Sequence, residues 1–139
     1  CVEHGVEVVY VSNHGGRQLD HGRGTIDMLP EIVKEVNGRA EIVVDGGFCR
    51  GADIVKALAR GADAVAIGKI QGLGLAADGE AGVHRVLELL EIEINTVMGL
   101  LGLDSLDKLS EQFLEPAQPV VTPGVLSAFP FLNLPLQEY

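Results

Sequence analysis

Large aromatic side chains are scarce in this sequence. Its 139 residues contain no Trp, and Phe and Tyr together make up only 4% of the chain. The core must therefore be built from aliphatic side chains. Together with 18 glycines, this composition is typical of an α/β protein with buried parallel strands.

Cysteine and long apolar runs are scarce as well. Cys1 and Cys49 supply neither a disulfide framework nor a metal cluster, which fits a reducing compartment. The sequence shows no apolar run of about 20 residues that could span a bilayer and no signal-peptide pattern. Residues 136–139 do not form a peroxisomal Ser-Lys-Leu ending. We therefore expect a cytoplasmic protein with no membrane segment and no metal site.

Basic residues are outnumbered by acidic ones. The 10 Lys and Arg against 20 Asp and Glu give a net charge of −10. This balance argues against nucleic acid or an anionic membrane as the main partner. Any bound anion must be held by locally placed cations and backbone amides.

Strand-like and helix-like segments alternate along the chain. We predict strands at 7–12, 41–44 and 64–67, and helices at 26–36 (capped by Thr25), 52–59, 70–77 and 80–101, with a helical turn at 105–109. Such alternation predicts a parallel sheet with right-handed crossovers. The long helix carries an apolar stripe that we expect to face the core: Val83, Val86, Leu87, Leu90, Ile94, Val97, Met98 and Leu101.

The two ends of the chain differ from its middle. Residues 1–5 have the pattern of a helix that ends at a glycine, so we interpret the chain as a piece of a longer protein. From Pro116 onward, prolines recur and periodicity is lost. We therefore divide the chain into a folded part, 1–115, and a Pro-rich tail, 116–139, expected to be irregular and either to lie on a partner surface or to be disordered.

The stretch Ser12-Asn13-His14-Gly15-Gly16-Arg17 directly follows the first predicted strand. In parallel α/β proteins the loops at the carboxyl ends of strands carry the chemistry. An imidazole there can move a proton, and a guanidinium can bind a carboxylate bidentately. The alternative is a tight turn with a structural His14 and a surface Arg17.

Two further loops follow the second and third strands. The segment Asp45 to Gly51 is rich in glycine and precedes a helix, so its N–H groups and the helix dipole favour a phosphate. Gly68-Lys69 adds a cation beside a glycine, and such paired loops form phosphate sites in (β/α)₈ barrels. Asp45 is placed to accept bonds from a ligand hydroxyl or, alternatively, to cap the strand end. Taken singly, each loop could be an ordinary strand-to-helix turn.

The motif Ser-Asn-His-Gly-Gly-Arg-Gln-Leu-Asp at 12–20 resembles the active-site signature of the FMN-dependent α-hydroxy acid oxidases and dehydrogenases. The similarity continues through Asp45-Gly46-Gly47, 51–59, 62–69 and 79–102, and it covers roughly residues 1–110. It implies an α/β fold, a (β/α)₈ TIM barrel of which this chain is the C-terminal part, about strands six to eight. It also implies FMN as cofactor and a small 2-hydroxy acid such as lactate or glycolate as substrate.

The resemblance also implies roles for individual residues. His14 would be the general base, and Arg17 would bind the substrate carboxylate. The residues implied to contact the flavin are Ser12, Asp45, Gly46, Gly47, Phe48, Cys49, Gly68 and Lys69.

Two positions depart from the family pattern, which has Arg at both Cys49 and Lys69. Lys69 keeps the charge, whereas Cys49 loses it, and a lost charged hydrogen bond costs about 1.5–3 kcal/mol. Arg50 could substitute, although its place in the chain should point it elsewhere. A reactive thiol at Cys49 is a further alternative.

The strands that would supply the other flavin and substrate contacts precede Cys1 in the family, so the chain alone is expected to be inactive. We expect the complete protein to be an FMN-dependent 2-hydroxy acid oxidoreductase and a homo-oligomer. A non-catalytic half-barrel that binds FMN or phosphate is the alternative. A different FMN or phosphate barrel, such as an isomerase, is disfavoured by the His14–Arg17 pair.

Overall fold

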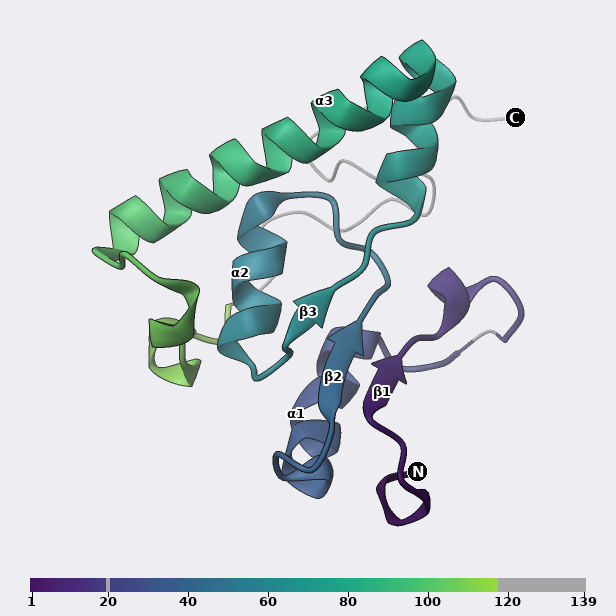
Figure 1. Cartoon of the computed structure of the whole chain (residues 1–139), viewed down its shortest axis with the longest axis vertical. Coiled ribbons are helices and arrows are strands. Elements are labelled where there is room, and N and C mark those ends of the chain that lie inside the picture. Colours follow the sequence, from purple (N-terminus) through teal and green to yellow (C-terminus); the bar gives the residue numbers. More distant parts are fainter. Residues whose placement is uncertain (20, 118–139) are drawn as a thin grey trace.

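The computed structural model describes residues 1–19 and 21–117, in which three strands form one parallel sheet. The strands β1 (Val8–Val11), β2 (Glu41–Val44) and β3 (Ala64–Val65) lie side by side in chain order. The register pairs Val8 with Glu41 and Val43 with Ala64. All three strands point the same way, so their carboxyl ends share one edge of the sheet (Figure 1). The predicted α/β class is confirmed.

The two faces of the sheet are covered very differently. Val11, Ile42 and Val44 are buried on one face, in the hydrophobic core. Neighbouring residues of a strand point to opposite faces, and on the other face Val8 and Tyr10 are 43% and 54% exposed. One face of the sheet is therefore bare in the described chain, and β1 and β3 are its two edge strands.

Helix α1 (Thr25–Val36) packs on the buried face of the sheet. Its apolar positions recur at three- and four-residue steps, and Leu29 and Val36 are buried in the core. Asn37 ends the helix in the left-handed conformation with φ 50°. The expected position of this helix is confirmed.

Two groups near the start of α1, the Ile26 carbonyl oxygen and the Thr25 hydroxyl, bond outside the helix. Pro30 has no N–H for the carbonyl of Ile26 four residues earlier, and Arg60 Nη1 donates to that oxygen at 3.1 Å. The prediction that Thr25 caps α1 is wrong. Gly24 holds the cap position, while the Thr25 hydroxyl donates to the carbonyl oxygen of Asp45. Both bonds tie α1 to segments further along the chain.

The last two helices cross closely. Helix α2 (Gly51–Ala59) begins against the bent helix α3 (Lys69–Leu101), whose two arms meet at the non-helical Asp78 and Gly79. A Cβ on Gly51 would lie 2.5 Å from the Glu93 Cβ and 2.6 Å from the Ile94 nitrogen. Figure 1 shows the longer arm of α3 passing over α2. This crossing therefore requires a residue without a side chain.

The two arms of α3 also meet at glycines. A Cβ on Gly82 would lie 1.9 Å from the Gly74 carbonyl oxygen. The arms correspond to the helices predicted at 70–77 and 80–101. The prediction that the stripe on the long arm faces the core holds only in part, because Leu90 and Met98 are buried whereas Leu87 is 52% exposed.

Short single turns complete the described chain. They are η1 (Val2–His4), η2 (His14–Gly16), η3 (Leu106–Lys108) and η4 (Glu111–Phe113). Strand β3 is shorter than the predicted 64–67, although Ala66 N still donates to Val44 O at 2.9 Å. None of the described helices combines the length and the apolarity needed to cross a bilayer. Most of the predicted tail, 118–139, lies outside the described residues, as does Asp20.

Candidate functional site

The turn after β1 is wound in the left-handed region. His14, Gly15 and Gly16 have φ values of 54°, 66° and 70°. His14 N donates to Ser12 Oγ at 3.1 Å, and Gly16 N donates to Asn13 O at 3.0 Å. A residue with a side chain is strained in this region by about 1 kcal/mol, so the local bonds must hold His14 there. The turn leaves the His14 and Arg17 side chains exposed at the strand-end edge.

The His14 ring has one hydrogen-bond partner within the same turn. Its Nδ1 lies 3.0 Å from Oε1 of Gln18, four residues further along the chain. Both side chains are exposed. One ring nitrogen of His14 is therefore bonded within the turn, and the other side of the exposed ring can be reached by a ligand.

Asp45 extends β2 and is bonded on several sides. Its N–H donates to Val11 O at 3.1 Å, and its Oδ2 accepts from the Tyr10 hydroxyl at 3.1 Å. Partial burial and the neighbouring Asp45 carboxylate raise the pKa of Tyr10. The second carboxylate oxygen, Oδ1, is buried and has no hydrogen-bond partner among the described residues. A buried acceptor without a donor is costly, so this oxygen is suited to a hydroxyl donor supplied from outside the described chain.

The first and second loops touch at Gly46. This residue has φ 102°, and a Cβ placed on it would lie 2.9 Å from Thr25 Oγ1 and 3.3 Å from Asn13 Oδ1. The second loop thus lies against the residue that precedes His14. Only glycine combines this φ with so close an approach.

The second and third loops are electrostatic neighbours. Burial and the Asp53 carboxylate raise the pKa of the Cys49 thiol, while the Lys69 ammonium acts in the opposite direction. The net effect raises the pKa of the thiol, which disfavours the alternative of a reactive thiol. The first loop therefore touches the second at Gly46, and Lys69 of the third lies close enough to act electrostatically on Cys49.

The start of α2 differs from the predicted phosphate cradle. Asp53 Oδ2 accepts from Cys49 N at 3.2 Å and from Arg50 N at 3.0 Å, and Glu93 Oε2 accepts from Gly51 N at 2.7 Å. Three amides expected to face a phosphate are thus already bound to carboxylates. The expectation that the N–H groups across Asp45 to Gly51 are available is wrong for these three positions.

Two side chains of the second loop, those of Arg50 and Phe48, are engaged inside the described chain. Arg50 Nε donates to Glu93 Oε1 at 2.8 Å, and its Nη2 lies 2.7 Å from the same oxygen. This pairing raises the pKa of Arg50 and lowers that of Glu93. Phe48 is 7% exposed and belongs to the hydrophobic core, so only its backbone remains to line a cofactor. Arg50 therefore does not replace the charge missing at Cys49.

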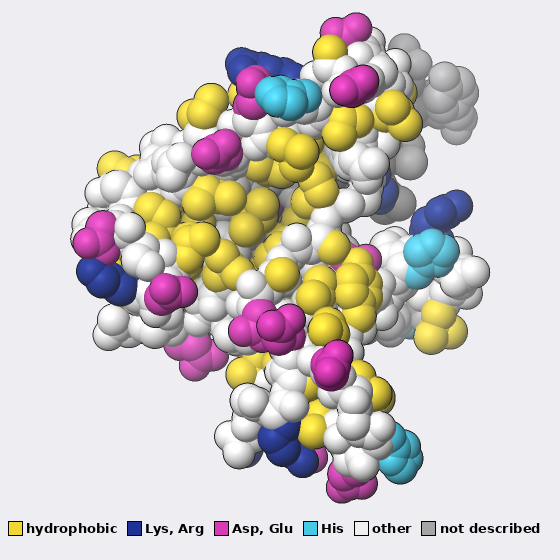
Figure 2. Space-filling view, in the orientation of Figure 1, with side chains coloured by type: hydrophobic (Ala, Val, Ile, Leu, Met, Phe, Trp, Pro, Cys, Tyr) yellow, Lys and Arg dark blue, Asp and Glu magenta, His cyan; other side chains and the backbone are white. Residues whose placement is uncertain are grey.

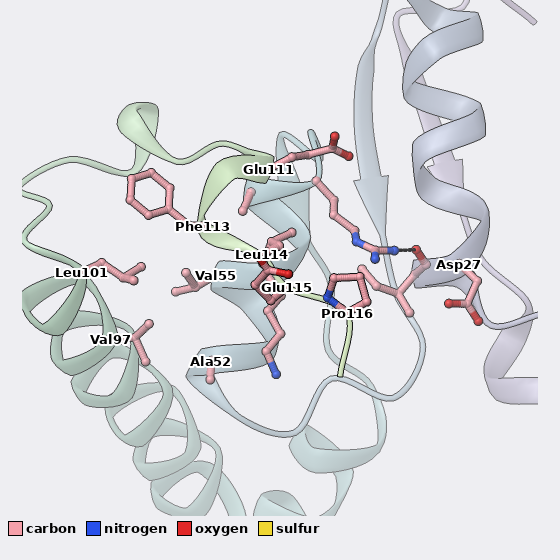
Figure 3. Close-up of a pocket in the computed structure, with 14 residues that line it drawn as sticks. Asp27, Ala52, Val55, Val97, Leu101, Glu111, Phe113, Leu114, Glu115 and Pro116 are labelled. Atoms are coloured by element: carbon pink, nitrogen blue, oxygen red, sulfur yellow. Dashed lines mark hydrogen bonds between the residues drawn. The ribbon is translucent and has the colours of Figure 1, made fainter. Parts of the chain in front are cut away.

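Two cavities of the described residues lie on the helices rather than at the turn that carries His14 and Arg17. One of about 650 Å³ lies between Cys49 and the two arms of α3, where apolar side chains gather in Figure 2. Another of about 530 Å³ lies between α1, α2 and the end of α3. Figure 3 shows Phe113, Leu114 and Pro116 at the second cavity. Neither of these two cavities is lined by His14 or Arg17, whose side chains are exposed.

Sequence reasoning missed several residues that shape the site. Gln18 lies within the quoted motif, and its spacing of four from His14 could have indicated the contact. Tyr10 could have been found from its place two residues before Ser12, because alternate residues of an extended segment point to the same side. Glu93 is 42 residues from Gly51 and carries no local signal. No group of three or more potential metal ligands comes together in the part of the chain that the structure describes.

Comparison with known proteins gives the family. The model of the FMN-dependent dehydrogenases matches residues 1–116. The chain belongs to the FMN-dependent dehydrogenase family. FMN is thus the cofactor of the family, and the resemblance noted from the 12–20 motif is confirmed.

Curated relatives are similar over most of this chain. L-lactate oxidase of Nostoc sp. is 52% identical over 114 residues, which is 82% of this chain and 31% of the relative. 2-Hydroxyacid oxidase 1 of Mus musculus is 52% identical over 102 residues, which is 73% of this chain and 28% of the relative. The chain thus spans only about a third of the length of these proteins.

Solved structures give the same result. A mandelate oxidase, 48% identical, superposes with a TM-score of 0.74 over 76% of this chain and 32% of that protein. An (S)-mandelate dehydrogenase described as a monotopic membrane protein, 41% identical, superposes with a TM-score of 0.80 over 84% of this chain and 31% of that protein. The three-stranded α/β unit is therefore an arrangement shared with FMN-dependent hydroxy acid enzymes.

Proposed function

We propose that this chain forms the C-terminal part, about strands six to eight, of a (β/α)₈ barrel. The barrel would use FMN to oxidise a small L-2-hydroxy acid to the 2-oxo acid. The relatives act on lactate, 2-hydroxy acids and mandelate, as their names state. The observation that carries the proposal is the exposed His14–Arg17 turn, which lies against the glycine loop at Gly46.

The bare face and the edge strands of the sheet support a larger barrel. Val8 and Tyr10 project from a face that no described helix covers. A parallel sheet is normally buried on both faces. Further strands and a filled barrel interior would cover these side chains, and the relatives are about three times as long as this chain. Residues 1–115 would belong to the barrel and 116–139 to its C-terminal extension.

FMN fits the chemistry of the strand-end edge. The unpartnered Asp45 Oδ1 can accept from a ribityl hydroxyl, and Lys69 supplies a positive charge for the phosphate. The residues that would hold FMN are Ser12, Asp45, Gly46, Gly47, the backbone of Phe48, Cys49, Gly68 and Lys69. When bound, FMN supplies an acceptor for the two electrons of the oxidation.

His14 and Arg17 would share the work on the substrate. The Arg17 guanidinium binds the carboxylate through two parallel hydrogen bonds and so fixes the position of the α-carbon. His14 takes a proton from the α-carbon or the hydroxyl as the substrate loses its electrons. Both side chains are exposed on one turn, so they can reach a single small ligand.

The test uses the protein in which this chain is joined to the rest of the barrel. We expect it to purify yellow with FMN and to lose its visible flavin absorbance anaerobically with lactate, glycolate or mandelate. Flavin that stays oxidised with all 2-hydroxy acids tried contradicts the catalytic proposal. The oligomeric state, expected to be a homo-oligomer, is measured on the same sample, and the cytoplasm is the expected compartment.

A non-catalytic half-barrel is the second candidate. It is favoured by the three amides of the second loop that already bind Asp53 and Glu93, since they weaken the phosphate site. This candidate predicts that FMN or a simple phosphate ester binds to the 139-residue chain and that the complete protein shows no turnover. Reduction of the flavin by any 2-hydroxy acid excludes it.

A further inference from the structure

The last part of the sequence and the groove beside its starting point are both apolar. We propose that residues 120–132 bind as an extended strap in the groove between α1, α2 and the end of α3. This groove is called the outer groove, and its apolar lining includes Ile26, Ala52, Val55, Val97, Leu101 and Phe113. The strap concerns the packing of this chain and does not rest on the flavin chemistry.

The outer groove is an apolar hollow with room for several side chains. Its volume is about 530 Å³. Val55, which lines it, is buried, whereas Val97 and Leu101 are only half-buried. The charged side chains that line it in exposed positions are Asp27, Lys56, Glu111 and Glu115. Apolar surface that is left partly in water beside charged side chains is typical of a binding site for another segment.

The sequence beyond the described residues has a composition that favours burial. Among residues 118–139 only Glu138 is charged, whereas charged residues make up 22% of the whole chain. The large apolar residues of this stretch are Val120, Val121, Val125, Leu126, Phe129, Phe131, Leu132, Leu134 and Leu136. Segments that stay solvated have high charge and few aromatic or branched side chains. Covering these residues with an apolar surface is therefore favourable.

The described chain already runs along the outer groove where this stretch begins. Figure 3 shows Phe113, Leu114 and Pro116 at the groove. Val120 follows Pro116 by four residues, which is at most about 14 Å of extended chain. A tethered segment binds at a high effective concentration. The chain's own residues are therefore favoured as the occupant over a second copy or a separate partner.

The prolines decide the form in which the strap can bind. Pro119, Pro123 and Pro130 have no N–H to donate, so they interrupt a helix and do not fit a central strand. Proline also restricts the free chain, so less conformational entropy is lost on binding. An extended segment that lies across the helices meets both conditions.

The rest of a barrel would pack on another part of the molecule. Leu29 of α1 and Ala57 of α2 belong to the core on the covered face of the sheet. Val8 and Tyr10 lie on the bare face, where further strands are expected. The outer groove lies among the helices instead. The match to the family model ends at residue 116, so the strap is a feature of this chain beyond the shared barrel.

Photo-crosslinking identifies the occupant of the outer groove. A benzophenone amino acid replaces Phe129 in the protein in which this chain is joined to the rest of the barrel. We expect crosslinked peptides from α2 or the last turns of α3, and the mass of a single chain on a denaturing gel. A doubled mass, which means a second copy, overturns the proposal. Crosslinks confined to other parts of the chain, or no crosslink at all, overturn it as well.

Proteolysis of the same protein measures how firmly the strap is held. Chymotrypsin cleaves after Phe131, and the cleavage rate follows the population of the detached segment. Leu101→Glu places a charge in the outer groove and should raise this rate about tenfold, the effect of losing one buried leucine contact. Leu100→Glu is the matched control and should leave the rate unchanged, because Leu100 is 83% exposed and does not line the groove.

A variant in the strap itself makes the test independent of the stability of the barrel. Val121→Asp should raise the cleavage rate as Leu101→Glu does, with an unchanged midpoint of urea unfolding, and it decides the question if Leu101→Glu fails to fold. A wild type that is cleaved as fast as Val121→Asp, or equal acceleration by Leu100→Glu, overturns the proposal. Flavin reduction by a 2-hydroxy acid is measured on the same wild-type sample, and its failure overturns the proposed function but not the strap.

Discussion

The loops after β1 and β2 lie against each other at Gly46, yet they are held in opposite ways. The first loop is held by its own residues, through Ser12 Oγ, Asn13 O and Gln18 Oε1. The second is held by distant residues, since Thr25 bonds Asp45 O and Glu93 bonds Gly51 N. The first leaves the side chains of His14 and Arg17 exposed, whereas the second has three amides occupied.

This difference in hydrogen bonding suits the two loops to different roles. A self-contained turn can carry a base and a carboxylate-binding group without depending on the rest of the fold. A loop hydrogen-bonded to α1 and α3 is held in a fixed position, but those hydrogen bonds occupy backbone amides that could otherwise bind an anion. The following predictions test this comparison, beginning with the largest expected effect.

Replacing His14 by Asn should remove the chemistry and leave the fold intact. We expect the anaerobic rate of flavin reduction in the complete protein to fall about 10²- to 10⁴-fold, because the base is lost. The unfolding midpoint should hardly change, since the side chain is exposed. Stopped-flow absorbance measures the rate, and His84→Asn, on the exposed surface of α3, is the control. A rate within about twofold of wild type would show that the first loop is only a turn.

Gly51→Ala should have the opposite outcome, with a large loss of stability. Its Cβ would lie 2.5 Å from Glu93 Cβ and 2.7 Å from Leu90 O, so α2 and α3 must separate. Overpacking of this kind costs about 1–3 kcal/mol, and we expect the upper end because backbone atoms are involved. Urea unfolding measures the loss. Gly99→Ala, with nothing within 4 Å, should be neutral or stabilise the helix by up to about 1 kcal/mol.

Cys49→Arg should strengthen cofactor binding at the second loop. The thiol carries no positive charge and the family pattern has Arg here, so under the proposed function the substitution would add a charged hydrogen bond to the phosphate. We expect FMN to bind about tenfold tighter, the lower end of the value of such a bond, with riboflavin unaffected. Flavin fluorescence quenching measures both affinities, and Cys49→Ser is the neutral control. Equal gains for FMN and riboflavin would mean that the phosphate is not bound beside Cys49.

Glu93→Gln should produce a smaller, pH-dependent loss of stability. Its pKa lies below its usual value of 4.5, mainly because Arg50 donates to it. A lowered folded pKa adds stability above pH 4.5 that is lost as the pH falls through the folded value. At pH 7 we expect the variant to be about 1 kcal/mol less stable, a charged hydrogen bond reduced for partial exposure.

The same unfolding curves provide the control for Glu93. In acid, the variant should lose less stability than wild type, so the two curves converge. Glu88→Gln removes an exposed carboxylate paired with Arg85 at 3.0 Å and should change little, as surface pairs do. A Glu93→Gln variant with the pH dependence of wild type would show that the Arg50–Glu93 pair adds no stability.

Much of the fold could be predicted because its signals are local. The run Val8–Val11 and the spacing of Leu29 and Val36 indicate a strand and a helix without knowledge of distant residues. The exposed Leu87 was mispredicted because a stripe shows which face is apolar but not what covers it. Thr25 was mispredicted because its acceptor, Asp45 O, lies 20 residues away. The groups of the first loop could be foreseen, but the occupied amides of the second could not.

The amino-acid sequence alone determined the alternation of strands and helices, the family, and the turn that presents His14 and Arg17, since all of these depend on neighbours within a few residues. The tertiary structure decided which groups are left for a ligand. It left Asp45 Oδ1 without a hydrogen-bond partner among the described residues, paired Arg50 with Glu93, and raised the pKa of the Cys49 thiol. The reason is that most possible partners of a hydrogen-bonding group lie far away in the sequence and come near it only when the chain folds. Contacts across 35 to 43 residues, such as Tyr10–Asp45 and Arg50–Glu93, therefore set which donors and acceptors of the site remain available.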